Sequence, residues 1–403
     1  MDLKSGLPFW AVKNGLMQAF PPLQRDTRCD VAVIGGGITG ALVANELASH
    51  GHDVVLVDGR DIGWGSTAAS TALLQYEIDT HLTDLAERLG EGPAVLAYRA
   101  CARAVTELDA LAREVRDVGF ARADSLYFAS RTRDVDGLLA EFELRRRHRL
   151  PVQWLEQDAV RERYAIDAPA AILSTLGGRI DPYRMTYRLL ARLQHRGVGV
   201  FDRTHIAELK ASARGVRLLT RDGVHLRADH AVLAGGYTNQ QWLKQRVARN
   251  HSSYAYVTEP MERAQLGPLA HTLVWETARP YLYLRSTSDN RLLVGGNDDR
   301  TDLPWRRDAR VDKKSRQLHQ RVQAMFPALR LEPAFAWAGT FAETEDGLPF
   351  FGPHPQYGPR LHFAMAYGGN GITYSMIGAG MLRARIERRR HPLAELFSFQ
   401  RID

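Results

Sequence analysis

The segment Asp30-Val-Ala-Val-Ile-Gly-Gly-Gly-Ile-Thr-Gly40 decides the fold of this chain. Its first five residues form a short apolar, β-branched run, which is typical of a strand buried in a parallel sheet. From Ala41 onward, small and apolar residues recur at helical spacing until Gly51, which suits the end of a helix. A second apolar run, Asp53-Val-Val-Leu-Val57, follows. We therefore expect a strand–helix–strand unit of an α/β fold.

The glycines between the first strand and the helix fit the pattern G-x-G-x-x-G. Gly35 permits the tight turn, Gly37 lets the backbone approach a pyrophosphate, and Gly40 lets the helix pack closely on the strand. The start of such a helix offers free N–H groups and partial positive charge to that anion. Asp58 ends the second strand, where an acid accepts a hydrogen bond from an adenosine ribose hydroxyl. The segment predicts a bound dinucleotide.

Three further segments favour FAD over NAD as that dinucleotide. The run from Gly65 to Gln75 is rich in small and hydroxylated residues that can meet phosphate and ribityl oxygens. Ala231-Val-Leu-Ala-Gly-Gly236 is a late buried strand that ends in two glycines. Gly368-Gly-Asn-Gly-Ile-Thr373 precedes the last predicted helix, whose N–H groups can stabilise a reduced flavin carbonyl. All three in this order indicate a long cofactor lying against backbone.

Composition and charge exclude several classes of protein. The 403 residues suggest two or three domains, with a formal net charge of +7 and only six lysines. We interpret the basic residues, including the cluster Arg145 to Arg149, as side chains on the solvent-exposed surface, so no nucleic-acid partner is expected. Two cysteines exclude a disulfide framework and a thiolate metal site, and the histidines lack metal-ligand spacing. No apolar run reaches the roughly 18 residues of a membrane span. We expect a cytoplasmic protein without a metal.

These motifs resemble the FAD-dependent oxidoreductase family of glycine oxidase, D-amino-acid oxidase, monomeric sarcosine oxidase and gamma-glutamylputrescine oxidase. The resemblance covers nearly the whole chain. It runs through Val31 to Gln75, Asp181 to Tyr183, Ala228 to Gly236, Tyr283 to Gly296 and Gly339 to Ser375. It implies an α/β fold, α+β overall, in which a doubly wound Rossmann-type FAD-binding domain joins a substrate domain with a mixed, largely antiparallel sheet.

The domains implied by the resemblance are both interrupted along the chain. The FAD-binding domain is expected to comprise residues 27–85, 150–245 and 337–390, and the substrate domain residues 86–149 and 246–336. Residues 1–26 are expected as an N-terminal segment packed on the surface, because docking on the protein's own surface is favoured over contact with lipid.

The expected cofactor is non-covalent FAD. Sarcosine oxidase tethers its flavin to a cysteine in the segment matching Gly339 to Asp346, where this chain has Gly339, and no histidine lies at Gly65 to Ala69, where other relatives carry one. The expected cofactor-binding residues are Gly35, Gly37, Ile38, Thr39, Gly40, Asp58, Gly59, Arg60, Gly65, Ser66, Thr67, Ala72, Leu73, Leu74, Gln75, Ile206, Ala234, Gly235, Gly236, Gly339, Gly369, Asn370, Gly371, Ile372 and Thr373.

The resemblance also implies a reaction. An amino acid or amine gives a hydride from its α carbon to flavin N5, water hydrolyses the imine, and oxygen or another acceptor reoxidises the flavin. Thr373 replaces a carboxylate-binding lysine of sarcosine oxidase, which argues against sarcosine as the substrate and turns attention to Arg285. No catalytic residue is identified. The candidates for the substrate pocket are Gln75, Tyr76, Tyr254, Tyr256, Tyr283, Arg285, Tyr367 and Tyr374.

Some questions stay open at this point. The motifs do not distinguish an oxidase from a dehydrogenase, and they leave the substrate and the oligomeric state undefined. Two other functions remain as alternatives. One is a flavin-dependent enzyme that modifies RNA, and the other is an FAD-binding subunit of a larger oxidoreductase complex.

Overall fold

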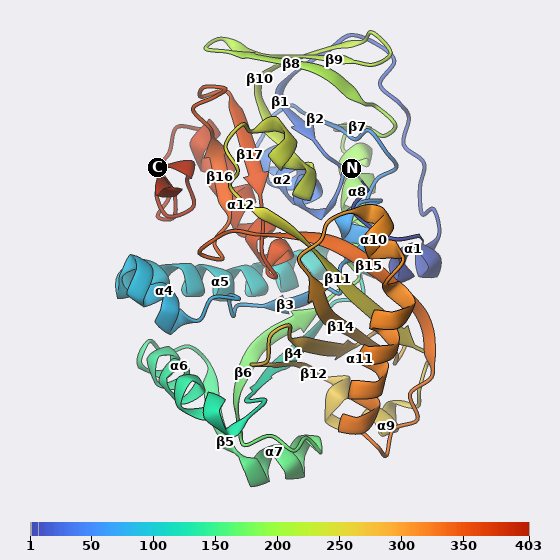
Figure 1. The fold of residues 1–403 in the computed structure, drawn as a ribbon. Coiled ribbons are helices and arrows are strands. Elements are labelled where there is room, and N and C mark those ends of the chain that lie inside the picture. The colour runs from blue at the N-terminus through green and yellow to red at the C-terminus, as the bar shows by residue number, and fades with distance from the viewer. Residues whose placement is uncertain (1, 7, 403) are drawn as a thin grey trace.

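Two β-sheets organise the chain in the computed structural model, which describes residues 2–6 and 8–402 (Figure 1). The first sheet has the order β16-β17-β10-β1-β2-β7, and a hairpin of β8 and β9 extends from β10. Its strands are β1 (Thr27–Ile34), β2 (Val54–Val57), β7 (Gly199–Phe201), β8 (Ile206–Ser212), β9 (Gly215–Thr220), β10 (His225–Leu233), β16 (Phe350–Pro353) and β17 (Leu361–Met365).

The centre of the first sheet is parallel and fully buried. β1 pairs in parallel with β2 and with β10, and β10 pairs in parallel with β17. Every residue of β2 is buried, as expected of a strand covered on both faces. Helix α2 (Ile38–Ser49) packs beside α8 (Pro182–His195) and α12 (Gly371–Ile386). The strand–helix–strand unit and the α/β class are confirmed.

The second sheet has the order β15-β11-β14-β13-β12-β4-β6-β3, with β5 paired to β6. Its pairs are antiparallel except for β12 with β4, so the mixed, largely antiparallel sheet is confirmed. Helix α11 (Val311–Met325) covers one face of β11, β14 and β15 (Figure 1). The strands are β3 (Leu73–Gln75), β4 (Ala121–Phe128), β5 (Val152–Glu156), β6 (Ala170–Arg179), β11 (Arg249–Thr258), β12 (Thr272–Glu276), β13 (Leu282–Ser286), β14 (Leu292–Asp299) and β15 (Pro333–Glu343).

The sheets divide the chain differently from the expected domain ranges, which remain a prediction. β5 and β6 lie within 150–245 but belong to the second sheet, and so does most of β15 within 337–390. Helix α5 (Glu91–Val115) lies within 86–149, yet it packs on α8 and α12 beside the first sheet. Periodicity along a strand does not reveal which sheet the strand joins, because the partner is distant in sequence.

The segment from Leu82 to Val115 forms two helices. α4 (Leu82–Leu89) ends at Gly90, whose φ of +88° favours glycine, and α5 follows directly. The remaining helices are α1 (Phe9–Asn14), α3 (Ser66–Ala69), α6 (Val135–Arg147), α7 (Gln157–Tyr164), α9 (Arg263–Leu266) and α10 (Pro304–Asp308), and the 3₁₀ helices are Thr132–Asp134, Gly236–Trp242, Gly267–Ala270 and Phe399–Ile402.

The basic cluster at the end of α6 is not uniformly solvated. Arg146, Arg147 and Arg149 are exposed, but Arg145 is wholly buried and lies 2.7 Å from Glu141 and 3.9 Å from Glu77. The prediction of a solvated face is therefore wrong for Arg145. It faces inward on α6, where paired carboxylates compensate the buried charge.

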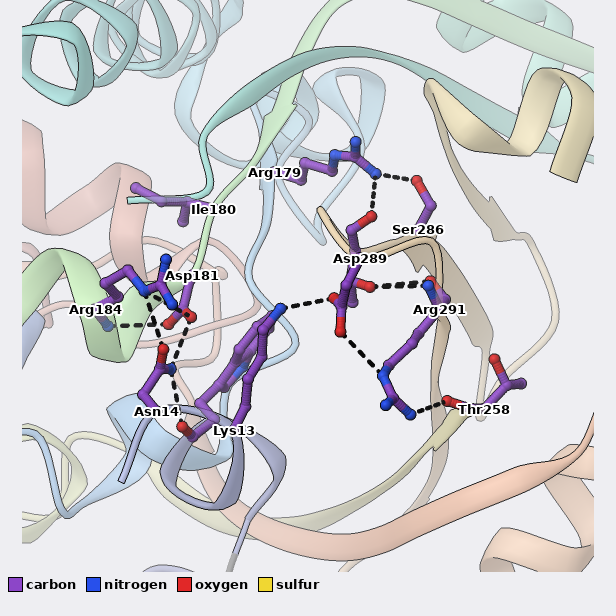
Figure 2. A network of polar contacts seen from close by, with 12 residues as sticks. Lys13, Asn14, Arg179, Ile180, Asp181, Arg184, Thr258, Ser286, Asp289 and Arg291 are labelled. Atoms are coloured by element: carbon purple, nitrogen blue, oxygen red, sulfur yellow. Dashed lines mark hydrogen bonds and ion pairs between the residues drawn. The ribbon is translucent and has the colours of Figure 1, made fainter. Parts of the chain in front are cut away.

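Helix α1 connects the N-terminal segment to the second sheet and to α8. Lys13 Nζ lies 2.6 Å from Asp289 in the turn between β13 and β14, and Asn14 donates to Asp181 before α8 (Figure 2). Phe9 and Trp10 are buried, whereas Leu16 is 64% exposed. Residues 1 and 7 of the expected segment 1–26 lie outside the described residues. Within the described ranges, no helix is long and apolar enough to cross a membrane.

Candidate active site

A cleft lies between the two sheets, with an empty volume of about 1630 Å³ that includes space open to solvent. The first sheet contributes the carboxyl ends of β1, β2 and β10, which is where open α/β sheets bind their ligands. The second sheet contributes residues of β11, β13, β14 and β15. The loop around Ser66 and the loop before α12 complete the walls.

At the end of the cleft formed by the first sheet, two positions require glycine because backbone atoms pack closely against them. Gly35 has a φ of +121°, and a Cβ added there would clash with the carbonyl of Ala234. A Cβ on Gly40 would clash with the carbonyl oxygen of Gly35. Glycine is needed at both positions so that α2 can begin at the cleft directly after β1.

Asp58 is held at the end of β2 by two backbone donors. Its Oδ2 accepts a hydrogen bond from Gly36 N at 2.6 Å, and its Oδ1 accepts one from Arg60 N at 2.8 Å. Burial raises the pKa of Asp58 above its ordinary value, and these two N–H groups oppose that rise. The carboxyl group is thus fixed at the wall of the cleft, with lone pairs left for a ligand hydroxyl.

Hydroxyl groups lie at the start of α2 and in the loop beside it. Thr67 Oγ1 accepts a hydrogen bond from Ile38 N at 3.0 Å and thereby satisfies one free backbone N–H group in the first turn of α2. Ser66 Oγ is buried in the wall of the cleft and has no hydrogen-bond partner within the protein. A buried polar atom without a partner is rare in native structures, so Ser66 indicates a polar ligand group at this position.

Tyrosines form the second-sheet end of the cleft. Tyr281 and Tyr283 both line it, as alternate residues of one strand should. The Tyr283 hydroxyl lies 3.1 Å from Ser253 Oγ, and the Tyr281 hydroxyl donates to Asp79 Oδ1 at 3.4 Å. Burial raises the pKa of both phenols, so they remain neutral hydrogen-bonding groups.

Carboxyl groups also gather at this end of the cleft. Glu77, Asp79 and Asp298 line it. Asp298 Oδ1 is buried and has no hydrogen-bond partner. The pKa of Asp298 is raised to about 7, mainly by burial and also by the carboxylates of Glu343 and Asp79, while the Ser253 hydroxyl and Lys314 oppose the rise. The residue as a whole is partly exposed, but its Oδ1 atom is enclosed by protein.

Glu77 differs from Asp298 because a cation lies beside it. Its side chain is wholly buried, and its Oε1 lies 3.9 Å from Arg145 Nη1. Burial raises the pKa of Glu77, while Arg145 lowers it. The same Arg145 lies 2.7 Å from Glu141. Glu77 therefore belongs to a buried ion cluster that underlies the cleft.

Comparison with known proteins shows the family of this chain. The model of the family "DAO: FAD dependent oxidoreductase" matches residues 30–385. The chain belongs to the DAO family of FAD-dependent oxidoreductases. The earlier expectation of FAD as the cofactor is confirmed, and so is the expectation of a flavoenzyme.

Curated relatives of this DAO-family chain span nearly its full length. Glycine oxidase of Geobacillus kaustophilus is 29% identical and covers 92% of this chain and 96% of its own. Gamma-glutamylputrescine oxidoreductase of Escherichia coli is 25% identical, with coverages of 94% and 88%. Among solved structures, the glycine oxidase of G. kaustophilus has a TM-score of 0.77 with 22% identity, covering 92% of this chain and 98% of its own. L-proline dehydrogenase from P. horikoshii has a TM-score of 0.76 with 18% identity, covering 94% of this chain and all of its own. These structures match the DAO-family fold.

Most of the expected FAD-binding residues line the cleft of the DAO-family chain. They come from four segments that are distant in sequence and meet at the edges of the two sheets. The residues that line it are Gly35, Gly37, Ile38, Thr39, Asp58, Arg60, Gly65, Ser66, Thr67, Ala72, Leu73, Gln75, Ala234, Gly235, Gly236, Gly339, Gly369, Asn370, Gly371 and Ile372. The glycine turn and the orphaned Ser66 hydroxyl make this wall fit a dinucleotide.

Five expected FAD-binding residues do not line the cleft. Gly40 packs against the carbonyl oxygen of Gly35, and Gly59 packs against His205. Leu74 alternates with the two cleft-lining residues of β3 and is buried in the core. Ile206 is the first residue of β8 and packs in the core. Thr373 donates to the carbonyl of Gln75 at 3.2 Å.

Arg285 lies outside the cleft, contrary to its expected role. It shares a strand face with Tyr283, but the loop at Thr71 covers it. Its guanidinium is buried and donates to the carbonyls of Thr71, Ser286 and Ile180 at 2.6, 3.1 and 2.8 Å. It also lies over the ring of Trp10. Alternation predicted the correct face of the strand but not what covers each position along it.

The tyrosine candidates divide into two groups. Tyr283, Tyr367 and Tyr254 line the cleft, as does Gln75, but the Tyr254 hydroxyl donates to Asp299 under α11. The other three tyrosines, Tyr76, Tyr256 and Tyr374, are buried in the core and do not line the cleft. Tyr76 bonds Ser174, Tyr374 donates to Gly347, and Tyr256 lies under α11 against His319.

Sequence reasoning missed the acidic residues of the cleft. Gln75 was expected to line it, and Glu77 and Asp79 follow Gln75 at alternate positions on the same side, so strand alternation was an available signal. Nothing in the sequence separates Asp298 from Asp299, since only the fold shows which carboxylate faces the cleft. Trp275, Tyr237, Phe341 and Ser253 were also missed.

The cysteines and histidines of the described residues lie away from the lining of the cleft. No cysteine or histidine is among the described residues that line the cleft. Cys29 and Cys101 are both buried elsewhere in the core. In residues 2–6 and 8–402, no three His, Cys, Asp or Glu side chains are placed to hold a metal ion.

Proposed function

We propose that this protein oxidises the C–N bond of an amine or amino acid, with non-covalently bound FAD as the first electron acceptor. The observation that carries the proposal is the cleft itself, whose dinucleotide-fitting wall faces a wall of tyrosine and carboxyl groups. Two relatives are named for glycine and for gamma-glutamylputrescine, both of which contain a C–N bond of this kind.

The first-sheet wall supplies the cofactor contacts in this proposal. The start of α2 at Gly37 and Ile38 would bind the pyrophosphate, Asp58 would accept hydrogen bonds from the ribose hydroxyls, and the Ser66 hydroxyl would donate to a cofactor oxygen. Helix α12 begins at Gly371, which lines the cleft, and its free N–H groups suit a carbonyl that gains negative charge. Bound FAD supplies the hydride acceptor.

The second-sheet wall orients the substrate in this proposal. The α carbon of the neutral amine loses a hydride, leaving a protonated imine, which water hydrolyses to a carbonyl compound and an ammonium ion. Tyr281, Tyr283 and Ser253 provide neutral hydrogen-bonding groups that hold the amine in one orientation. The second electron acceptor, oxygen or another, is left open.

Anaerobic mixing of the holoprotein with amines tests the proposal. A substrate will bleach the visible absorbance of the flavin in the absence of oxygen. Admitting oxygen afterwards separates an oxidase, whose flavin absorbance returns rapidly, from a dehydrogenase, whose absorbance returns slowly. Failure of every amine and amino acid to bleach a flavin that dithionite still reduces would refute the proposed function.

A further inference from the structure

Charge is unevenly distributed along the cleft. Among the described residues that line it, Arg60 is the only one with a cationic side chain, and it follows Asp58 at the first-sheet end. The second-sheet end carries Glu77, Asp79 and Asp298 and no cation. A substrate carboxylate bound there would meet carboxyl groups and no arginine or lysine. Among the described residues, this end of the cleft offers an anionic group no arginine or lysine with which to pair.

Asp298 and Asp299 show which carboxylate is available to a ligand. They are consecutive on β14, so their side chains leave opposite faces of the sheet. Asp299 accepts from Arg310, Lys314 and the Tyr254 hydroxyl at 2.8, 2.8 and 2.9 Å. Asp298 faces the cleft, and its Oδ1 is buried without a partner.

The other charged groups near Asp298 do not supply its missing partner. Lys314 is bound to Asp299 and to the carbonyl of Asn297. Arg279 lies over the ring of Tyr281 and donates to the carbonyls of residues 276–278. Glu343 has the same sign as Asp298 and lies 3.4 Å from His251.

The two remaining acids of the cleft are already engaged. Asp79 accepts from Gly369 N at 2.7 Å and from the Tyr281 hydroxyl at 3.4 Å. Both oxygens of Glu77 are buried without a hydrogen-bond partner, but Arg145 Nη1 lies 3.9 Å from Oε1 and balances the charge of Glu77. Asp298 has the neutral Ser253 hydroxyl beside it, but its Oδ1 is buried without a hydrogen bond and no cation pairs with the carboxylate. A buried carboxylate is stable when a cation pairs with it.

We propose that Asp298 binds a positively charged nitrogen of the substrate, and that the substrate is a diamine or polyamine rather than an amino acid held by its carboxylate. This inference rests on the proposed function and specifies the substrate class of the same cleft. Asp298 determines specificity in this account and takes no part in the transfer of the hydride.

The nitrogen bound by Asp298 is not the nitrogen that is oxidised. A carboxylate beside an ammonium group stabilises the protonated form and raises its pKa. Hydride loss from the α carbon requires the neutral amine, whose lone pair forms the new C–N double bond. A second nitrogen avoids this conflict because it remains charged at Asp298 while the first is oxidised.

Three amines that differ at one end test the inference on the wild-type holoprotein. These are 1,4-diaminobutane, butylamine and 4-aminobutanoate, which end in an ammonium group, a methyl group and a carboxylate. Anaerobic flavin reduction gives a limiting rate and a half-saturation concentration for each. A charge-assisted hydrogen bond predicts half-saturation by the diamine at a concentration about 10- to 100-fold below that for butylamine. The aminobutanoate should be the poorest of the three.

Variants at two consecutive residues distinguish binding by Asp298 from the effect of removing any negative charge near the cleft. Asp298→Asn should remove the preference for the diamine over butylamine, mainly by raising the half-saturation concentration and with less change in the limiting rate. Asp299→Asn makes the same chemical change one residue away, on the other face of the sheet, and should keep the preference. The flavin absorbance of each purified variant shows whether the cofactor is retained.

The outcomes distinguish this inference from the proposed function. If glycine or butylamine reduces the flavin as readily as the diamine does, this inference is overturned and the proposed function stands. An unchanged diamine preference in Asp298→Asn also overturns the inference alone. If no amine or amino acid reduces the flavin, both fail. Should Asp298→Asn lose its flavin, the comparison of the three amines on the wild-type protein still decides the matter.

Discussion

Arg285 Nε donates to the carbonyl oxygen of Thr71 at 2.6 Å, and this bond joins the second sheet to the loop that lines the cleft. The same guanidinium bonds Ser286 and Ile180. An arginine that sequence patterns assign to the substrate is therefore a structural residue. It fixes the loop that runs from Ser66 to Gln75 along one wall of the cleft.

Replacing Arg285 tests this structural role. Arg285→Met leaves three buried carbonyl groups without their donor, so the free energy of unfolding should fall by about 3 kcal/mol. Arg330→Met is a suitable control because the Arg330 side chain is 90% exposed, and it should change stability by less than about 0.5 kcal/mol. Urea unfolding of both variants measures the difference. Equal, small effects would return Arg285 to the list of ligand-binding candidates.

Ser66 is expected to bind the cofactor with a hydroxyl that has no other partner. Ser66→Ala should weaken FAD binding to the apoprotein by about 2- to 10-fold, since one hydrogen bond is worth roughly 0.5–1.5 kcal/mol. The stability of the apoprotein should not fall, because the hydroxyl is unpaired there. Titration of FAD with its fluorescence as the signal measures the affinity. An unchanged dissociation constant would remove Ser66 from the cofactor site.

Gly40 is expected to be essential because of close packing. In Gly40→Ala the new methyl group would strike the carbonyl oxygen of Gly35, which belongs to the backbone and cannot rotate away. We expect a loss of about 3 kcal/mol or more in the free energy of unfolding. Gly380→Ala in α12 meets no atom within 4 Å and should instead stabilise the protein by about 0.5–1 kcal/mol. Thermal unfolding compares the two, and a tolerated Gly40→Ala would contradict the packing described here.

The ionisation of Asp298 predicts a pH-dependent stability. Burial raises its folded-state pKa to about 7, so the folded protein binds more protons than the unfolded chain between about pH 4 and pH 7. The contribution of Asp298 to stability therefore falls as pH rises through this range. Asp298→Asn lacks this penalty and, without amine present, should be more stable than wild type by about 4 kcal/mol at pH 8 but not at pH 4. Urea unfolding at the two pH values measures this, and a constant difference would show that Asp298 titrates normally.

Local sequence patterns predicted the elements that bind the dinucleotide. The run from Asp30 to Gly40 indicated strand, turn and helix because burial, glycine and periodicity act over a few neighbouring residues. Patterns of this kind also located the loop from Gly65 to Gln75 and the glycines before α12 in the cleft. Most of the expected cofactor residues line the cleft, and their contacts with FAD remain a prediction.

The substrate end was harder to predict because it depends on contacts between distant segments. Alternation placed Tyr283 and Arg285 on one face, yet Thr71 and Trp10 cover only the second of them. The acids of the cleft come from β14 and from the segment after β3, and their orientation depends on how the sheets meet. A carboxylate becomes a candidate for ligand binding only when its partners, or the lack of them, are known.

The most direct test of the central claim is anaerobic reduction of the bound flavin by an amine panel. It should include glycine, butylamine, 4-aminobutanoate and 1,4-diaminobutane, with dithionite as the control for a reducible flavin. The account predicts bleaching of the visible flavin absorbance, with half-saturation at the lowest concentration for 1,4-diaminobutane. A flavin that dithionite reduces and that every amine and amino acid leaves oxidised would contradict it.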